Sequence, residues 1–196
     1  ATGRIVRGEA NLAVEASARG PLDLGGAEIA GAVDATGRLT GRIVRPSLSM
    51  RGAMSSFTAG GVVVEQPVLN FTLSPRGDAY VGRADVNGAA SGRALTASAN
   101  VTIGSGALSL DTLDAQWGAL LAQGSAQFAS RGVSAQLDVN GAIDGLVPGL
   151  TGRLAGNLQL TPETILLDAN VADARAGELR VRAATLRAEG PLEAIA

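Results

Sequence analysis

Apolar and polar residues alternate along most of this chain with a period of two. In GEANLAVEASARG, residues 8–20, the even positions from 10 to 18 are apolar and the odd positions are mostly polar. A β-strand points successive side chains to opposite faces, so this pattern predicts a strand with one apolar and one solvated face. The same rhythm returns in LNFTLS, RALTASANVTI, GSAQF, VSAQLDV, LAGNLQL, ILLDANV and ELRVRA.

Glycine-containing segments separate these runs, among them SPRGD, VNGAASG, IGSG, SRG and RAG. Glycine and its polar neighbours tolerate the positive φ angles that tight hairpins require. The sequence therefore predicts a meander of antiparallel strands. The spacing of the turns predicts strands of about 10 residues, or about 33 Å, which is longer than the usual five or six residues.

Two segments depart from the alternation, 46–61 and 110–124. The first predicts a short helix or a loop. In the second, the apolar phase moves from Leu108 and Leu110 to Leu113, Ala115 and Trp117. A β-bulge, or a turn at Gly118, would produce such a shift.

One phrase occurs twice, as TGRLTGRIV at 36–44 and as TGRLAGNLQL at 151–160. We expect Gly37 and Gly152 to turn the chain, and the leucines that follow to lie on the apolar face. The phrase would then open a strand each time. Reuse of such a unit suggests an elongated sheet that is built by addition.

The composition removes most catalytic chemistry. The 196 residues include no histidine and no cysteine, and all 16 basic residues are arginine. Ser-His-Asp triads, cysteine nucleophiles, imidazole or thiolate metal sites and lysine chemistry are therefore excluded. A carboxylate-based enzyme stays open, but Asp111 and Asp114, three apart in a strand, would face opposite sides. We expect no enzymatic activity, no catalytic residue, no metal and no cofactor.

Charge and hydropathy limit the partners and the domain organisation. The net charge is −2 and aromatic residues make up only 3% of the chain, which argues against nucleic-acid binding. No apolar run approaches the roughly 18–20 residues of a membrane-spanning helix, and the N-terminus carries no signal pattern. Because the final residues stop within the alternating pattern, we expect residues 1–196 to be one segment of a longer protein.

The apolar side of the predicted strands is poor in bulk, because alanine and glycine alternate there with leucine, valine and isoleucine. A closed sandwich about 10 Å thick must be filled by interdigitating side chains, so such a face fills it badly. An open, U-shaped sheet has no such requirement, because another molecule can occupy its interior. Each buried methylene of an acyl chain would contribute about 0.8 kcal/mol.

These patterns predict an all-β fold: an elongated, mostly antiparallel, curled sheet that forms a U-shaped apolar groove. A closed β-sandwich and a β-solenoid are the alternatives. The predicted lining of the groove consists of the larger apolar residues of the alternating runs. They are Leu12, Val14, Leu39, Ile43, Leu69, Phe71, Leu73, Val101, Ile103, Phe128, Leu137, Val139, Leu154, Leu158, Leu160, Ile165, Leu167, Val171, Leu179 and Val181.

The phrases GRLTGRI and GRLAGNLQL, the stretch AQWGALLAQGSAQF and the glycine-punctuated amphipathic strands resemble the bacterial AsmA-like group, which includes TamB and YdbH. These envelope-spanning proteins are related in design to the eukaryotic bridge-like lipid transfer proteins. The resemblance covers the whole chain. Members also have an N-terminal membrane anchor, so the resemblance implies that residues 1–196 are a fragment excised from a longer protein.

The resemblance implies a β-taco segment of a periplasmic protein anchored in the inner membrane. Such a segment would conduct phospholipid between the inner and outer membranes or assist outer-membrane protein assembly. Its partners would be phospholipid acyl chains, adjacent segments of the same long chain and outer-membrane proteins. Free sheet edges also predict self-association. The alternative function is that of a structural or adhesive β-solenoid or sandwich of a surface protein.

Overall fold

The computed structural model describes residues 2–19, 22–23, 27–59, 62–104, 106–130, 132–144 and 149–191. The chain divides into two compact units, Ala1–Ser105 and Gly106–Ala196, called unit 1 and unit 2 below. The described residues of both units consist of β-strands and turns and contain no helix. The all-β prediction is therefore confirmed.

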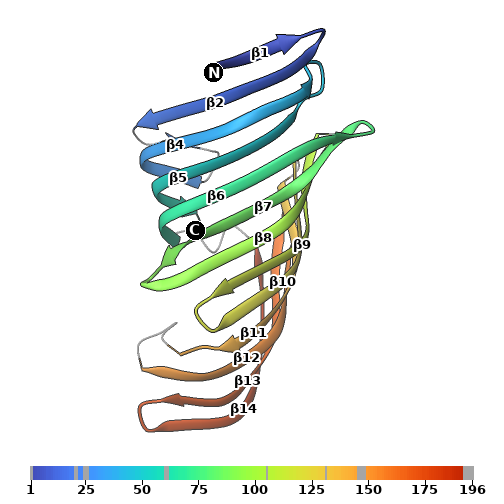
Figure 1. The fold of residues 1–196 in the computed structure, drawn as a ribbon. Coiled ribbons are helices and arrows are strands. Elements are labelled where there is room, and N and C mark those ends of the chain that lie inside the picture. The colour runs from blue at the N-terminus through green and yellow to red at the C-terminus, as the bar shows by residue number, and fades with distance from the viewer. Residues whose placement is uncertain are drawn as a thin grey trace. The chain divides into compact units, whose positions relative to one another are not determined.

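Unit 1 is one antiparallel sheet in which each long strand pairs with the next along the chain (Figure 1). The short β3 (Leu22–Asp23) pairs with β4 at the side of this path. The other strands are β1 (Thr2–Val6), β2 (Glu9–Arg19), β4 (Ala27–Arg42), β5 (Ser47–Ala59), β6 (Val62–Arg76), β7 (Ala79–Ala90) and β8 (Arg93–Gly104).

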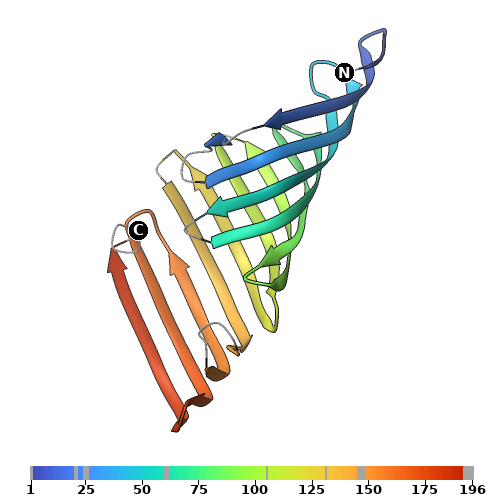
Figure 2. The same cartoon turned by 90° about the vertical axis from the view of Figure 1, so that its left-hand side faces the viewer.

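Unit 2 repeats this arrangement without a side strand, and Figure 2 shows its strands side by side. Its strands are β9 (Ala107–Trp117), β10 (Leu120–Ala129), β11 (Gly132–Ala142), β12 (Leu150–Leu160), β13 (Thr164–Ala176) and β14 (Leu179–Pro191). Apart from β1 and β3, the strands of both units have 10 to 16 residues, as the turn spacing predicts.

Within each unit, the pairing rules out both alternative folds. The strands lie in one curled sheet, and within a unit no described residue pairs the first strand with the last. A closed sandwich would need two facing sheets. A β-solenoid would need parallel rungs, whereas these strands are joined as antiparallel hairpins.

Two-residue turns use left-handed residues in two ways. In Arg7-Gly8 both residues have positive φ, 51° and 80°, and Ser91-Gly92 is similar, as in a type I′ turn. In the turn after β9, only the first residue, Gly118, has a positive φ, 58°, as in a type II′ turn. The glycine signals in the sequence therefore mark real hairpins.

The shift of apolar phase in segment 110–124 has the predicted cause. The register of β9 on β10 slips by one residue between Gly124 and Ala126, and Thr112 in β9 has a φ of 48°. Two residues of β9 oppose one of β10 there, which is a β-bulge. Leu110 and Leu113 consequently pair with Ala126 and Gly124 and lie on the same face of the sheet. The turn at Gly118 follows the bulge.

Two predictions about local structure are wrong. Segment 46–61 is no helix or loop, because β5 occupies most of it and pairs along its length with β4 and β6. Gly37 and Gly152 do not turn the chain, because they lie inside β4 and β12. The physical reason is close approach between strands: a Cβ on Gly37 would lie 2.7 Å from Met50 Cγ, and one on Gly152 3.0 Å from Ala174 Cα.

In the part of the chain that the structure describes, there is no helix that is long and apolar enough to cross a membrane.

Candidate functional site

Apolar side chains of neighbouring strands line up in rows across the sheet of unit 1. Directly paired residues point to the same face of a sheet, so each row belongs to one face. We call this surface the apolar face of unit 1. Its central row consists of Leu12, Leu39, Leu48, Leu73, Gly82 and Val101. The next two rows, both on the same side of it, are Val14, Gly37, Met50, Phe71, Ala84 and Ala99, and then Ala16, Ala35, Gly52, Leu69, Val86 and Ala97.

Unit 2 has an equivalent surface, which we call the apolar face of unit 2. Its central row consists of Leu113, Gly124, Leu137, Leu158, Leu167 and Ala188. The rows on one side are Ala115, Ala122, Val139, Gly156, Ala169 and Leu186, then Trp117, Leu120, Gly141, Leu154, Val171 and Ala184. On the other side lies the row of Leu110, Ala126, Ala135, Leu160 and Ile165.

The opposite faces are polar. One row of unit 2 consists of Asp114, Gln123, Asp138, Asn157, Asp168 and Arg187. Within it, Gln123 Nε2 donates a hydrogen bond of 2.7 Å to Asp114 Oδ1, and Asn157 Nδ2 donates one of 3.0 Å to Asp138 Oδ1. In unit 1, Arg83 Nε pairs with Asp85 Oδ1 at 3.0 Å. Each sheet is therefore amphipathic.

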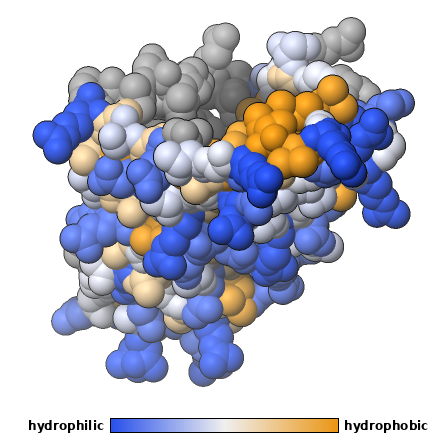
Figure 3. Space-filling model, turned by 45° about the horizontal axis from the view of Figure 1, so that its top comes forward, coloured by the Kyte–Doolittle hydropathy of each residue, from blue (hydrophilic) through white to orange (hydrophobic). Residues whose placement is uncertain are grey.

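Among the described residues of each unit, no second layer of secondary structure covers the apolar face. Among the described residues, few side chains are buried, and Val101 is the largest that is less than 2% exposed. Leu137 and Leu158 are only partly buried, and Phe128 and Leu186 are 41% and 47% exposed. Figure 3 shows apolar residues gathered in one exposed group on a side that is otherwise mostly polar.

Glycines interrupt the apolar rows where neighbouring strands approach closely. A Cβ on Gly82 would collide with the Thr72 carbonyl and lie 3.0 Å from Leu73 Cα. One on Gly124 would meet the Gln136 carbonyl, and one on Gly156 would lie 2.6 Å from the Asp168 oxygen. Such contacts with backbone cannot be relieved by a side-chain rotation. These glycines therefore allow the close approach of neighbouring strands, and they contribute to the lack of bulk on the apolar faces.

The structure brings most of the predicted lining residues together, in two sets. On unit 1 the set is Leu12, Val14, Leu39, Leu69, Phe71, Leu73, Val101 and Ile103, the last in a row with Pro75 and Tyr80. On unit 2 the set is Phe128, Leu137, Val139, Leu154, Leu158, Leu160, Ile165, Leu167 and Val171. Phe128 pairs there with Leu108 and Val133.

Three predicted lining residues lie outside these rows. Ile43 is in the turn after β4, 49% exposed, because the strand ends at Arg42 and Ile43 N donates to Gly8 O. Leu179 and Val181 pair with Ala176 and Ala174, beyond an irregularity at Asp173. Ala176 also pairs with Leu150, which is four residues from Leu154 on β12, so the register places Leu179 on the apolar face of unit 2 in a further row, and Val181, two residues along β14, with it.

Other residues of the apolar faces are absent from the predicted lining. Leu48 and Met50 belong to β5, and they alternate with polar residues in SLSMRGAM. The predicted lining omits them because segment 46–61 is expected to form a short helix or a loop. Leu113 and Trp117 follow the bulge in β9, and a lining chosen from uninterrupted runs omits them.

One arginine reaches the end of the apolar face of unit 1. The Arg45 guanidinium carbon lies 5.8 Å from the centre of the Tyr80 ring, and Arg45 Nη2 donates a hydrogen bond of 3.3 Å to the Ala79 carbonyl. Tyr80 shares its row with Ile103. A cation therefore stands where the apolar surface ends.

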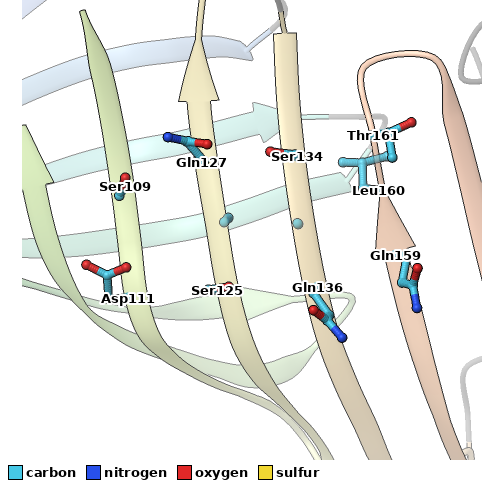
Figure 4. A pocket seen from close by; sticks show the side chains of 11 residues that line it. Ser109, Asp111, Ser125, Gln127, Ser134, Gln136, Gln159, Leu160 and Thr161 are labelled. Carbon is cyan, nitrogen blue, oxygen red and sulfur yellow. The ribbon is translucent and has the colours of Figure 1, made fainter. Parts of the chain in front are cut away.

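A shallow polar depression of about 450 Å³ lies on the polar face of unit 2 and extends across strands β9, β10, β11 and β12 (Figure 4). Ser109, Ser125, Gln127 and Gln136 contribute to its lining, together with Asp111. Asp114, hydrogen-bonded to Gln123, is on this polar face as well. The expectation that Asp111 and Asp114 face opposite sides is thus wrong, because the bulge at Thr112 adds a residue between them.

The described residues contain no cluster of three or more side chains that could hold a metal ion. The arrangement offers instead two extended apolar surfaces, each backed by a polar one. No protein-family model, no curated protein and no solved structure matches this chain.

Proposed function

We propose that the apolar faces bind the acyl chains of phospholipids and that the chain is a lipid-conducting segment of an AsmA-like envelope protein. The observation that carries the proposal is the continuity of the apolar rows. In unit 2, the row from Leu113 to Ala188 crosses every strand from β9 to β14 without a polar side chain.

The dimensions of an acyl chain suit these rows. Neighbouring strands lie about 4.8 Å apart, so a row that crosses six strands spans about 24 Å. One leaflet of a bilayer's hydrocarbon core is about 15 Å thick. An acyl chain can thus lie along one row, where each methylene that leaves water contributes about 0.8 kcal/mol. Alanine and glycine in the rows leave room for it.

The proposed site needs no catalytic group. A lipid would move with its tails on the apolar face and its head group toward solvent. We propose that this takes place in the periplasm, in a protein that carries phospholipid between the two membranes or assists outer-membrane protein assembly. Adjacent segments of a longer chain would continue the surface.

A pair of neighbouring substitutions tests the proposal. Leu137→Asp places a charge on the apolar face of unit 2, and Gln136→Asp places the same charge on the polar face one residue away. We expect protein purified from cells to carry phospholipid, detected by native mass spectrometry and organic extraction. Leu137→Asp should lose most of it and Gln136→Asp should retain it. A wild-type protein that is lipid-free and indifferent to added lipid would contradict the proposal.

A further inference from the structure

The hairpin of β13 and β14 brings three arginines to one place. Arg175 of β13 is paired directly with Arg180 of β14, and Arg182 follows two residues later on the same strand. All three line one depression of about 560 Å³, together with Asp173, Ala174 and Val181. No two of these arginines are adjacent in the sequence, and a turn separates Arg175 from Arg180. Their convergence is therefore not visible in the sequence alone.

This arrangement is unfavourable for the sheet by itself. Like charges directly opposite each other on neighbouring strands destabilise a sheet. Among the described residues, none of the three arginines forms an ion pair or a side-chain hydrogen bond. Asp173 supplies the one negative charge in the lining, which leaves a net charge of 3 − 1 = +2. A bound anion would offset the repulsion.

We propose that Arg175, Arg180 and Arg182 bind the phosphate group of a phosphate monoester or diester. The planar guanidinium fork matches phosphate oxygens in a bidentate manner, and charge-assisted hydrogen bonds of this kind are strong. Paired residues and i, i+2 neighbours on one strand are close enough for long side chains to converge on one group.

A small anion fits better than a polyanion. Residues 106–196 contain 6 arginines and 10 acidic residues, so unit 2 has a net charge of 6 − 10 = −4. A nucleic acid would be repelled by the rest of the unit, whereas one phosphate group feels mainly the local positive charge. The phosphate can belong to a lipid head group or to a free phosphate ester. The inference does not depend on the binding of acyl chains.

Isothermal titration calorimetry with three soluble ligands tests the proposal. Glycerol phosphate has the phosphate without tails, dihexanoyl phosphatidic acid has both, and dihexanoylglycerol has tails without phosphate. We expect wild-type protein to bind glycerol phosphate in a salt-sensitive manner, and the triple variant R175Q/R180Q/R182Q to bind it at least tenfold more weakly. Arg187→Gln, on the same strand, is the control and should keep wild-type binding.

The variants also report on the mechanism. Because Arg→Gln removes a repulsion, the midpoint of thermal unfolding of the triple variant should be no lower than that of wild type. A loss of binding in this variant would then not result from unfolding. Arg180→Lys keeps the charge but not the fork, and should bind more weakly than wild type and more tightly than Arg180→Gln. No binding of glycerol phosphate to wild type, or equal loss in Arg187→Gln, would overturn the proposal.

The remaining outcomes separate the phosphate site from the acyl-chain site. Tighter binding of dihexanoyl phosphatidic acid than of glycerol phosphate supports a lipid head group as the source, and equal binding supports a free ester. If the protein binds glycerol phosphate but gains nothing from acyl chains, the phosphate site is supported and the proposed function is contradicted. If it binds dihexanoylglycerol but not glycerol phosphate, the proposed function is supported and the phosphate site is contradicted.

Discussion

Glycine has a structural task on the apolar faces. A glycine within a strand loses more conformational entropy on folding than any other residue and has no side chain to pack. Glycines in the middle of long strands therefore need an explanation. In most apolar rows, one glycine faces backbone atoms of a neighbouring strand so closely that a Cβ has no space. Gly52 differs, because the nearest atoms to its Cβ would be 3.9 Å away.

This difference predicts opposite effects for one substitution at two glycines. Gly82→Ala forces the added methyl group against the backbone of Thr72 and Leu73, and should lower the free energy of unfolding by about 1–3 kcal/mol. Gly52→Ala makes only ordinary van der Waals contacts and should be neutral or stabilise the protein by up to about 1 kcal/mol. Chemical denaturation of both variants checks the prediction. Equal losses would show that glycine acts there through something other than close approach.

The bulge in β9 keeps the apolar residues of this strand on one face of the sheet. Leu110 and Leu113 are three residues apart, so in a regular strand they would point to opposite faces, and the bulge at Thr112 returns them to the same face. Thr112 has a φ of 48°, which a β-branched residue adopts only at a cost, so the surrounding pairs hold it there. The bulge is thus a device that repairs the phase of the pattern.

Deletion of Thr112 should therefore be tolerated, because it removes the extra residue and leaves Leu110 and Leu113 two residues apart in a regular strand. We expect the free energy of unfolding to stay within about 1 kcal/mol of the wild-type value. The fluorescence of Trp117, the only tryptophan of the chain, should keep its emission maximum. Insertion of one alanine between Asp114 and Ala115 is the contrasting variant, because it adds a residue that the existing bulge does not compensate, and it should destabilise the protein and red-shift the emission. A large loss of stability in the deletion variant, or an unshifted emission in the insertion variant, would contradict this account.

The sequence pattern predicts the elements well, because alternation directly reports which face each side chain occupies. It predicts the long strands, the hairpins and the phase shift in β9. It misplaces β5, where glycine and alanine interrupt the alternation that Leu48 and Met50 begin. It also assigns turns to Gly37 and Gly152, which lie where neighbouring strands approach closely. Pairing across strands is not visible in one strand's pattern. The cluster at Arg175, Arg180 and Arg182 therefore appears only with the register.

At the scale of the whole molecule, two units carry the same design. Each is a curled antiparallel sheet whose long strands pair in chain order, with one apolar face and one polar face. Such a sheet grows by addition of hairpins, and each added strand extends the apolar rows by one position. In a closed core, those apolar side chains would instead pack against one another. The design leaves apolar surface free for a molecule other than the protein.

Photo-crosslinking with a phospholipid that carries a diazirine in its acyl chain tests this claim most directly. After irradiation, mass spectrometry maps the modified residues along the chain. We predict adducts on the apolar rows of both units, at Leu39 and Phe71 and at Leu137 and Leu158, with few on neighbouring polar-face residues such as Gln136. Adducts distributed equally over both faces, or no adducts, would contradict the account.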